Sequence, residues 1–375
     1  MRCVDTLSEA ELRGKRVLVR SDFNLPLGND GKVSDTFRVR QGWKTIAYLA
    51  ARGARVIVIS HIGRDPGESI KPVADAMKRF GPVVFVPDLT GAMAQDAVAH
   101  LKDGEIMLLE NLRHDERETK NVPALSRELA ALADLYVDDA FAAAHRAHAS
   151  IVGVPALLPH YAGLLMRDEV AAIGAARSPQ APSVALLGGA KFETKSPLIK
   201  LLLEHYGHLF IAGALANDIF KARGLPVGRS LVSQELPDIS ILEHPHLLVP
   251  VDVTTETPDG QARVKRPEEV TDRDKIVDIG PDTVAMLATH LLHAKFILWN
   301  GPTGLYERGY THYTEAVAVL VAESDATKVI GGGDTIAALE HANVPKEKLG
   351  FLSTGGGAML EYLLQGTLPG IDALA

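Results

Sequence analysis

Two stretches, KVIGGGDTIAALE (residues 328–340) and FLSTGGGAMLEYL (351–363), each place three glycines between an apolar run and an apolar helical pattern. An apolar run that leads through glycine into a helix is typical of a parallel, doubly wound sheet. Glycine lets the backbone approach a ligand closely and leaves its N–H groups free, and the helix adds a partial positive charge at its N-terminus. The triplets therefore predict anion seats at two helix starts, with a tight turn or close helix packing as the alternative for each.

The same alternation of strand and helix runs through the rest of the chain. Strands are predicted at 16–20, 54–60, 83–86, 105–109 and 134–138, and helices at 41–53 and 71–81. After a Ser/Pro-rich break at 178–183 the pattern restarts, with strands predicted in SVALLGG, HLFIAG, HLLVPVDV, FILWNGP and KVIGGGD. We expect an α/β fold of two doubly wound parallel-sheet domains joined by a helix and hinge, with a cleft between them.

Length and composition limit the class of protein. The chain has 375 residues, of which 46% are apolar and 23% charged, as in ordinary globular proteins. Its formal net charge of −8 argues against a nucleic-acid or membrane-surface binder. No apolar run approaches the ~20 residues of a membrane span. One cysteine, Cys3, excludes a disulfide framework, and the charged start of the sequence is unlike a signal peptide, so we expect a cytoplasmic protein.

Basic residues gather at the predicted strand ends of the first half. The segments RSDFN (20–24), SHIGR (60–64), ENLR (110–113) and DDAFAAAHRAH (138–148) follow strands, and DTFRVR (35–40) precedes a helix. Ligands of parallel sheets bind beyond the carboxyl ends of the strands, and arginine matches phosphate and carboxylate oxygens bidentately. We therefore predict a site for a multiply charged anion, formed by Arg38, His61, Arg64, Arg113 and Arg146. Taken singly, each arginine has surface ion pairing as an alternative.

The HRAH sequence also admits a metal interpretation, because His145 and His148 are three residues apart. A zinc site needs further Cys, His or carboxylate ligands at matched spacing, and an arginine between the two histidines is unfavourable. We expect packed or anion-facing histidines instead.

The strand ends of the second half carry glycine, small polar residues and two lysines, Lys191 and Lys195. This composition predicts a phosphate cradle. Neither the G-x-x-x-x-G-K-[ST] motif nor a G-x-G-x-x-G motif with a later acid is present, which excludes a P-loop enzyme and an evident dinucleotide fold. Asp334, directly after the first triplet, is placed to bind Mg²⁺ beside phosphate oxygens.

Nine motifs, in order, resemble the phosphoglycerate kinase family along almost the whole chain. They are VLVRSDFNLPL, RVR at 38–40, SHIGR, LLENLR, DDAFAAAHRAHAS, LLGGAKFETK, ILWNGPTGLYE, IGGGDT and STGGGAMLEYL. The resemblance implies reversible phosphoryl transfer between 1,3-bisphosphoglycerate and MgADP, giving 3-phosphoglycerate and MgATP, by a monomer. It also implies a phosphoglycerate-binding domain at 1–155, an interdomain helix and linker at 156–180, a nucleotide-binding domain at 181–353, and a segment at 354–375 that returns toward the first domain.

The resemblance assigns roles to residues of this chain. Phosphoglycerate is expected on Asp22, Asn24, Arg38, His61, Arg64, Arg113 and Arg146. The nucleotide is expected on Lys195, Gly213, Asn300, Pro302, Glu307, Gly332, Gly333, Asp334 and Thr335, with the metal on Asp334. Catalysis is expected from Arg38, Lys191, Gly355, Gly356 and Gly357, which would stabilise the transferring phosphoryl group.

The chain departs from the family pattern at a few places and leaves two rival functions. Ala212 and Ala214 flank Gly213 where the family has three glycines, and Tyr313 replaces a frequent glycine; their effect on nucleotide affinity stays open. One rival is a weakly active binding paralogue, which an altered Arg38, Lys191 or Asp334 would have favoured. The other is a different carboxylate kinase, which would have altered the arginine half. All these residues are intact, so we expect an active kinase.

Overall fold

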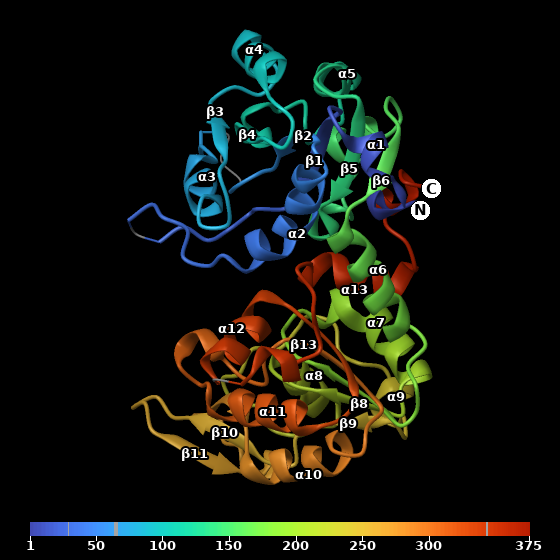
Figure 1. The fold of residues 1–375 in the computed structure, drawn as a ribbon. Coiled ribbons are helices and arrows are strands. Elements are labelled where there is room, and N and C mark those ends of the chain that lie inside the picture. Colours follow the sequence, from blue (N-terminus) through green and yellow to red (C-terminus); the bar gives the residue numbers. More distant parts are fainter. Residues whose placement is uncertain (29, 64–66, 343) are drawn as a thin grey trace. The chain divides into compact units, whose positions relative to one another are not determined.

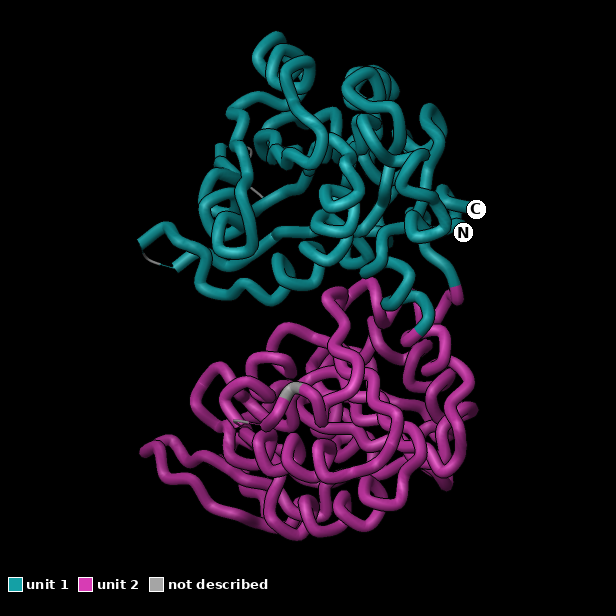
Figure 2. The backbone as a smooth tube through the Cα atoms, viewed as in Figure 1, with its two compact units in different colours: residues 1–171, 367–375 teal, residues 172–366 magenta. Residues whose placement is uncertain are grey.

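A computed structural model describes residues 1–28, 30–63, 67–342 and 344–375. The chain divides into two compact units, one of residues 1–171 and 367–375 and the other of residues 172–366 (Figure 2). Each unit is built on its own six-stranded sheet, so each is described by itself.

The first unit contains a wholly parallel sheet with the strand order β3-β4-β2-β1-β5-β6 (Figure 1). Its central strand β1 buries every residue from Val17 to Ser21, as expected when helices cover both faces of a parallel sheet. The strands are β1 Arg16–Ser21, β2 Arg55–Ile59, β3 Val84–Val86, β4 Ile106–Leu109, β5 Leu135–Asp139 and β6 His160–Ala162. The helices are η1 Val4–Thr6, α1 Glu9–Leu12, α2 Phe37–Ala51, α3 Lys71–Met77, α4 Ala92–His100, η2 Leu112–His114, α5 Pro123–Ala131, η3 Phe141–Ala143, η4 Ala149–Gly153, α6 Leu164–Ala176 and α14 Pro369–Asp372.

The second unit contains a parallel sheet with the order β15-β14-β13-β7-β8-β9 and a separate antiparallel sheet with the order β11-β10-β12. Its strands are β7 Ser183–Leu187, β8 His208–Ile211, β9 Leu247–Leu248, β10 Val253–Glu256, β11 Ala262–Lys265, β12 Lys275–Ile279, β13 Phe296–Asn300, β14 Thr327–Gly331 and β15 Phe351–Leu352. Its helices are α7 Phe192–His205, α8 Ala214–Ala222, α9 Ile239–Leu242, η5 Pro267–Glu269, α10 Pro281–Leu291, η6 Tyr306–Arg308, α11 His312–Glu323, α12 Gly333–His341, η7 Lys346–Lys348 and α13 Gly356–Gln365.

Each parallel sheet has one point where the order of its strands reverses. In the first unit the chain moves from β1 outward through β2 and later continues on the other side of β1 with β5. In the second unit β8 and β9 lie on one side of β7, and β13, β14 and β15 lie on the other. Open parallel sheets bind their ligands at such switch points, beyond the carboxyl ends of the strands. The loops after β1 and β5, and those after β7 and β13, are therefore the places to look for a site.

The interior of each unit contains a large apolar cluster of buried side chains. In the first unit it includes Val17, Val19 and Ile46, and in the second Ile297, Trp299 and Val317, all essentially inaccessible to solvent. In the described part of the chain no helix combines the length and the apolar character needed to cross a bilayer.

The α/β fold with two parallel sheets confirms the expectation from sequence, but two element predictions were wrong. HLLVPVDV is not one strand: Leu247–Leu248 form β9, and Val253–Glu256 form β10 in the antiparallel sheet. Pro250 lies between them, and proline has no N–H to continue a ladder. The helix predicted at 41–53 begins at Phe37, whose N–H donates to Asp35 Oδ1 at 2.7 Å. Arg38 therefore lies in the first turn of α2 and not in a segment before it.

The limits of the units differ from the predicted domain limits. The first unit extends to Ala171, inside α6, because the start of this helix is tied to the first unit: Leu164 N donates to Thr45 Oγ1 at 2.9 Å. The predicted returning segment 354–375 is divided. Residues 367–375 belong to the first unit, whereas α13 packs on α7 in the second. The assignment of a substrate to each domain stays a prediction.

Candidate active site

Two buried basic side chains mark the switch point of the first unit. Arg20, near the end of β1, is 1% exposed, and His61, after β2, is 4% exposed. Arg20 Nη2 lies 3.2 Å from His61 Nδ1. Since a guanidinium only donates, Nδ1 is the acceptor and the His61 proton is on Nε2. Burial lowers the pKa of His61 to about 3, and nearby arginines act in the same direction, so the ring is a neutral donor at physiological pH.

Asp22, Asn24 and Arg38 form a polar cluster beside this pair. Arg38 Nη1 donates to Asp22 Oδ1 at 3.2 Å and to Asn24 O at 3.0 Å, and Asn24 Oδ1 accepts from Gly63 N at 3.0 Å. Burial raises the pKa of Asp22, but nearby basic side chains, Arg38 and Arg20 among them, offset this effect and the pKa is lowered overall. The cluster thus joins the loop after β1, the first turn of α2 and the loop after β2.

Arg113 and Arg146 add further positive charge to this site. Burial lowers the pKa of Arg113, and Arg146 and Arg20 lower it further, which shows that these cations repel one another. Among the ion pairs of the described residues, none involves Arg20, Arg113 or Arg146. A bound polyanion would relieve this repulsion. Arg64, predicted for the same site, lies outside the described residues.

Three further residues belong to this site but were not assigned from the sequence. One is Arg20, described above. Asn111 joins two loops, because its Oδ1 accepts from Ile62 N at 3.2 Å and from Arg113 N at 3.0 Å. His148 has a pKa lowered to about 4, by burial first and then by neighbouring arginines. Arg20 and Asn111 lie at or shortly after the end of a strand, which was the only sequence signal for them. His148 lies further along, in the HRAH sequence, for which a packed or anion-facing histidine was expected.

One histidine of the HRAH sequence forms a hydrogen bond with its neighbour. Arg146 Nε donates to His145 Nε2 at 3.1 Å, so that ring nitrogen acts as an acceptor. Across residues 1–28, 30–63, 67–342 and 344–375, no three His, Cys, Asp or Glu side chains are grouped as metal ligands.

In the second unit the two glycine triplets lie against each other. Gly332, just before α12, has φ +98°, a backbone conformation that favours glycine. A Cβ added to Gly356 would lie 3.2 Å from Gly332 Cα, so this close approach also favours glycine. A Cβ added to Gly333 or Gly357 would meet nothing within 4 Å. Open space therefore lies beside the first turns of both helices, as a site that binds an anion requires.

Asn300, at the end of β13, faces this junction. Its Nδ2 is buried and has no hydrogen-bond partner within the described part of the chain. A Cβ added to Gly332 would lie 3.6 Å from that nitrogen, and Gly301 N donates to Thr335 Oγ1 at 2.8 Å. The structure thus brings together Asn300, Gly332 and Thr335, all of which were predicted for the nucleotide.

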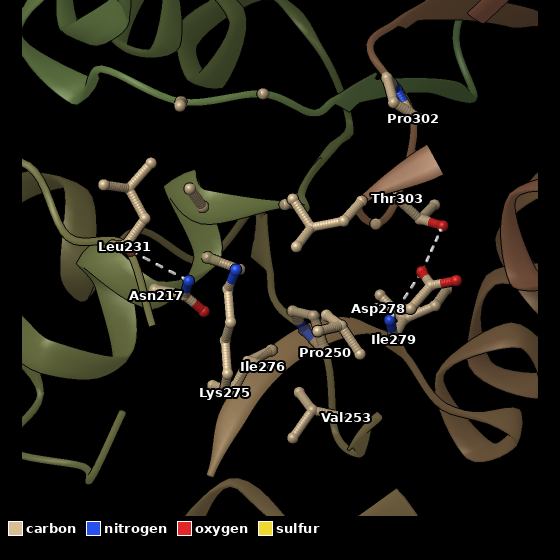
Figure 3. A pocket seen from close by; sticks show the side chains of 18 of the residues that line it. Asn217, Leu231, Pro250, Val253, Lys275, Ile276, Asp278, Ile279, Pro302 and Thr303 are labelled. Atoms are coloured by element: carbon tan, nitrogen blue, oxygen red, sulfur yellow. Dashed lines mark hydrogen bonds between the residues drawn. The ribbon is translucent and has the colours of Figure 1, made fainter. Parts of the chain in front are cut away.

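The second unit also contains a cavity of about 290 Å³, and Pro302 and Thr303, which follow β13, are among the residues that line it (Figure 3). Four of the residues predicted for the nucleotide line it: Gly213, Pro302, Glu307 and Asp334. Its wall also contains residues that sequence analysis missed, namely Asn217, Lys275, Asp278 and Thr303. Lys275 and Asp278 were missed because β12, which carries them, was not predicted as a strand.

Asp278 is the unusual titratable group of this wall. Burial raises its pKa to about 7, although Thr303 Oγ1 and Ile279 N each donate to its Oδ1 at 2.8 Å. The carboxyl is therefore partly protonated near neutral pH.

The two lysines of the second unit lie at the start of α7. Lys191 is exposed and precedes the first helical residue, whereas Lys195 lies one turn along the helix, with a pKa lowered by burial. Three residues named above differ from the family pattern. Ala214 lines the cavity, Ala212 is buried at 3% exposure, and Tyr313 packs against the core of the unit. Only Ala214 is therefore placed to touch a ligand in the cavity.

Comparison with known proteins gives one consistent result. The model of the family described as phosphoglycerate kinase matches residues 7–366. A phosphoglycerate kinase of Granulibacter bethesdensis is 43% identical over 392 aligned positions, which cover 98% of each chain. The solved structure of phosphoglycerate kinase from Coxiella burnetii has a TM-score of 0.83 at 35% identity, covering 99% of this chain and 98% of its own. That from Pyrococcus horikoshii has a TM-score of 0.88 at 28% identity, covering 100% and 98%.

Proposed function

Because the chain belongs to the phosphoglycerate kinase family, we propose that its two candidate sites bind the two substrates of that reaction, one in each unit. The enzyme transfers a phosphoryl group reversibly between 1,3-bisphosphoglycerate and ADP, giving 3-phosphoglycerate and ATP. We assign a role in this reaction to each residue of the two sites.

The basic site of the first unit binds the phosphoglycerate. Its ligands are Asp22, Asn24, Arg38, His61, Arg113 and Arg146, together with Arg64, which lies outside the described residues. Mutual repulsion among the arginines supports this assignment, because a substrate with several negative charges relieves it. Neutral His61 adds an N–H donor without adding charge.

The glycine-rich site of the second unit binds the nucleotide. Lys195 and the backbone of Gly332, Gly333 and Thr335 hold the phosphates, at a helix start where N–H groups are free. Glu307 takes the ribose, and the remaining contacts come from Gly213, Asn300 and Pro302. Support comes from the cavity, since it is lined by four of these predicted nucleotide ligands, Asp334 included.

Asp334 fits the requirements of a Mg²⁺ ligand. It is an exposed carboxylate in the first turn of α12 and lines the cavity. Mg²⁺ is usually held by one or two carboxylates and by substrate phosphates. When bound there, the ion would neutralise phosphate charge.

Transfer itself is assigned to Arg38 from one unit and to Lys191 with Gly355, Gly356 and Gly357 from the other. Phosphoryl transfer needs positioning and charge neutralisation rather than a covalent protein group. The acceptor carboxylate is already ionised at neutral pH, so no general base is required. The observation that carries this assignment is the contact of the two triplets, which puts Gly356 beside the nucleotide seat at Gly332.

Reaction also requires that the reacting atoms come within ~3–3.5 Å of each other. Since the two sites belong to different units, we propose hinge closure when both substrates are bound.

A monomer suffices, because one chain carries every assigned residue. One cysteine in 375 residues is in keeping with a cytoplasmic location.

Steady-state kinetics of Lys191→Ala tests the assignment. Deletion of a group that stabilises transition-state charge typically lowers kcat by about 10²–10³. We expect that loss with little change in KM for 3-phosphoglycerate, measured with MgATP and a reductant-linked readout. Lys200→Ala is the matched control, because Lys200 lies on the same helix and forms a surface ion pair with Asp238. A Lys191 variant whose kcat stays within a few-fold of the parent would refute the role.

A further inference from the structure

The start of α7 is held in an unusual way. Lys191, which precedes the helix, has φ +64° and ψ +74°, and it provides no side-chain cap. Besides Asn121, it is the one non-glycine residue with positive φ in the described part of the chain. A left-handed conformation in a residue with a Cβ persists only where the surroundings hold it.

A distant loop supplies the missing cap. Phe192 N, the first N–H of α7, donates to Ser233 Oγ at 2.9 Å. In the same turn Glu193 Oε1 accepts from Gln234 N at 2.9 Å. The loop at 233–234 therefore caps the helix from 41 residues away. A capping oxygen of this kind satisfies one of the free N–H groups of a first turn.

Asp218 in turn fixes Ser233. Ser233 N donates to Asp218 Oδ1 at 2.7 Å, and Ser233 Oγ donates to Asp218 Oδ2 at 2.9 Å. Asp218 lies on α8 and is fully buried. Because a serine hydroxyl has one proton, these bonds have one direction: Phe192 N–H to Ser233 O–H to the Asp218 carboxylate. A charged acceptor at the end of such a chain strengthens it.

From this geometry we propose that Ser233 and Asp218 are positioning residues that hold Lys191 in its left-handed conformation and thereby aim its ammonium group. The proposal rests on the catalytic role assigned to Lys191 above. Neither Ser233 nor Asp218 touches a substrate in this account, because each acts through the backbone at the start of α7.

The first test is Ser233→Ala, which removes the oxygen that accepts from Phe192 and donates to Asp218. We expect kcat to fall by about tenfold, as when a catalytic group is misplaced, with KM for 3-phosphoglycerate unchanged. Ser233→Thr retains the hydroxyl and should restore most of kcat. Ser324→Ala is the matched control, since Ser324 Oγ accepts a hydrogen bond from Ala326 N at 3.2 Å in the same unit, in a turn before β14. It should leave kcat unchanged.

The second test places Ser233→Ala in a Lys191→Ala background. If Ser233 acts through Lys191, its substitution has no further effect on kcat there. An equal fall in kcat in both backgrounds overturns the inference. If Lys191→Ala lowers kcat and Ser233→Ala does not, the inference fails and the proposed function stands. If Lys191→Ala leaves kcat unchanged, both the catalytic assignment and the inference fail.

A third measurement covers the case in which Ser233→Ala does not fold. Asp218→Asn keeps the shape of the side chain but removes its charge and one acceptor oxygen. We expect faster hydrogen exchange at the first turn of α7 and a lower kcat in the parent background, without effect on kcat in the Lys191→Ala background. Unchanged exchange and unchanged kcat would contradict the proposal.

Discussion

At the scale of single residues, charged side chains give the sharpest tests of the proposed sites. Asp334 is one of two exposed carboxylates, with Glu307, that line the cavity proposed for the nucleotide. We expect Asp334→Ala to raise the Kd of MgADP by about tenfold or more, because phosphate charge is then less neutralised, with the Kd of 3-phosphoglycerate unchanged. Calorimetry measures both constants, and ADP without Mg²⁺ is the control, which parent and variant should bind alike. Equal weakening of both ligands would contradict the metal assignment.

Asp278 gives a prediction about pH. Its pKa is raised from 3.8 to about 7 in the folded chain. Between these values the unfolded state ionises while the folded state stays protonated, so this group lowers stability as pH rises through that window, and the loss is complete above about 7. A shift of that size corresponds to about 4 kcal/mol at most.

Asp278→Asn removes this penalty and still accepts hydrogen bonds at Oδ1. The variant should therefore melt at a higher temperature than the parent at pH 8, and the difference should vanish near pH 4. Thermal unfolding at several pH values measures it. A constant difference across that range would show that Asp278 does not titrate as its burial implies.

Some site residues were predictable from the sequence and others were not. Asp22, Asn24 and His61 follow predicted strands, and the carboxyl ends of parallel strands meet at one edge of a sheet. Arg20 lies inside β1. A strand pattern does not reveal that this side chain is buried and has no carboxylate as an ion-pair partner among the described residues. Asn111 acts on the backbone of two loops, and such contacts depend on tertiary structure.

At the scale of elements, we expect two neighbouring glycines at the start of α13 to have different roles, Gly356 in packing and Gly357 in activity. Gly356→Ala places a Cβ 3.2 Å from Gly332 Cα, so we expect it to destabilise the protein by about 1–3 kcal/mol. Gly357→Ala meets no atom within 4 Å and should keep or raise stability, because alanine favours a helix by roughly 0.5–1 kcal/mol over glycine. Denaturant unfolding measures both changes.

The Gly357 variant should nevertheless lose activity. Its added methyl group occupies the space proposed for the transferring phosphoryl group, and kcat should fall by about tenfold or more. A stable Gly357→Ala enzyme with the parent's kcat would remove the second triplet from the catalytic assignment.

The elements that sequence analysis found and missed differ in burial. Parallel strands such as β7 and β13 were predictable because burial on both faces makes them short, continuous apolar runs. The three-residue strand β6 was not predicted. The antiparallel sheet was missed because β11 is mostly exposed and carries Arg263 and Lys265. Its pairing with β10 is a tertiary contact that no local pattern shows.

At the scale of the whole molecule, the proposed hinge closure makes a prediction about the size of the protein in solution. We expect the radius of gyration in solution to fall when 3-phosphoglycerate and a non-reacting MgATP analogue are bound together. Small-angle scattering measures it, with each ligand alone as the control. An unchanged radius, with both ligands shown to be bound, would contradict hinge closure.

The return of residues 367–375 to the first unit affects how the protein is made. Gly370 N donates to Ala144 O at 2.8 Å, and α14 packs on η4, so these residues support the backbone next to His145 and Arg146. A ribosome must first synthesise the 195 residues of the second unit (366 − 171), which takes ~10–40 s at about 5–20 residues per second. The unit that leaves the ribosome first is thus completed last, and we expect the nascent chain to lack a finished form of the proposed phosphoglycerate site until residues 367–375 emerge.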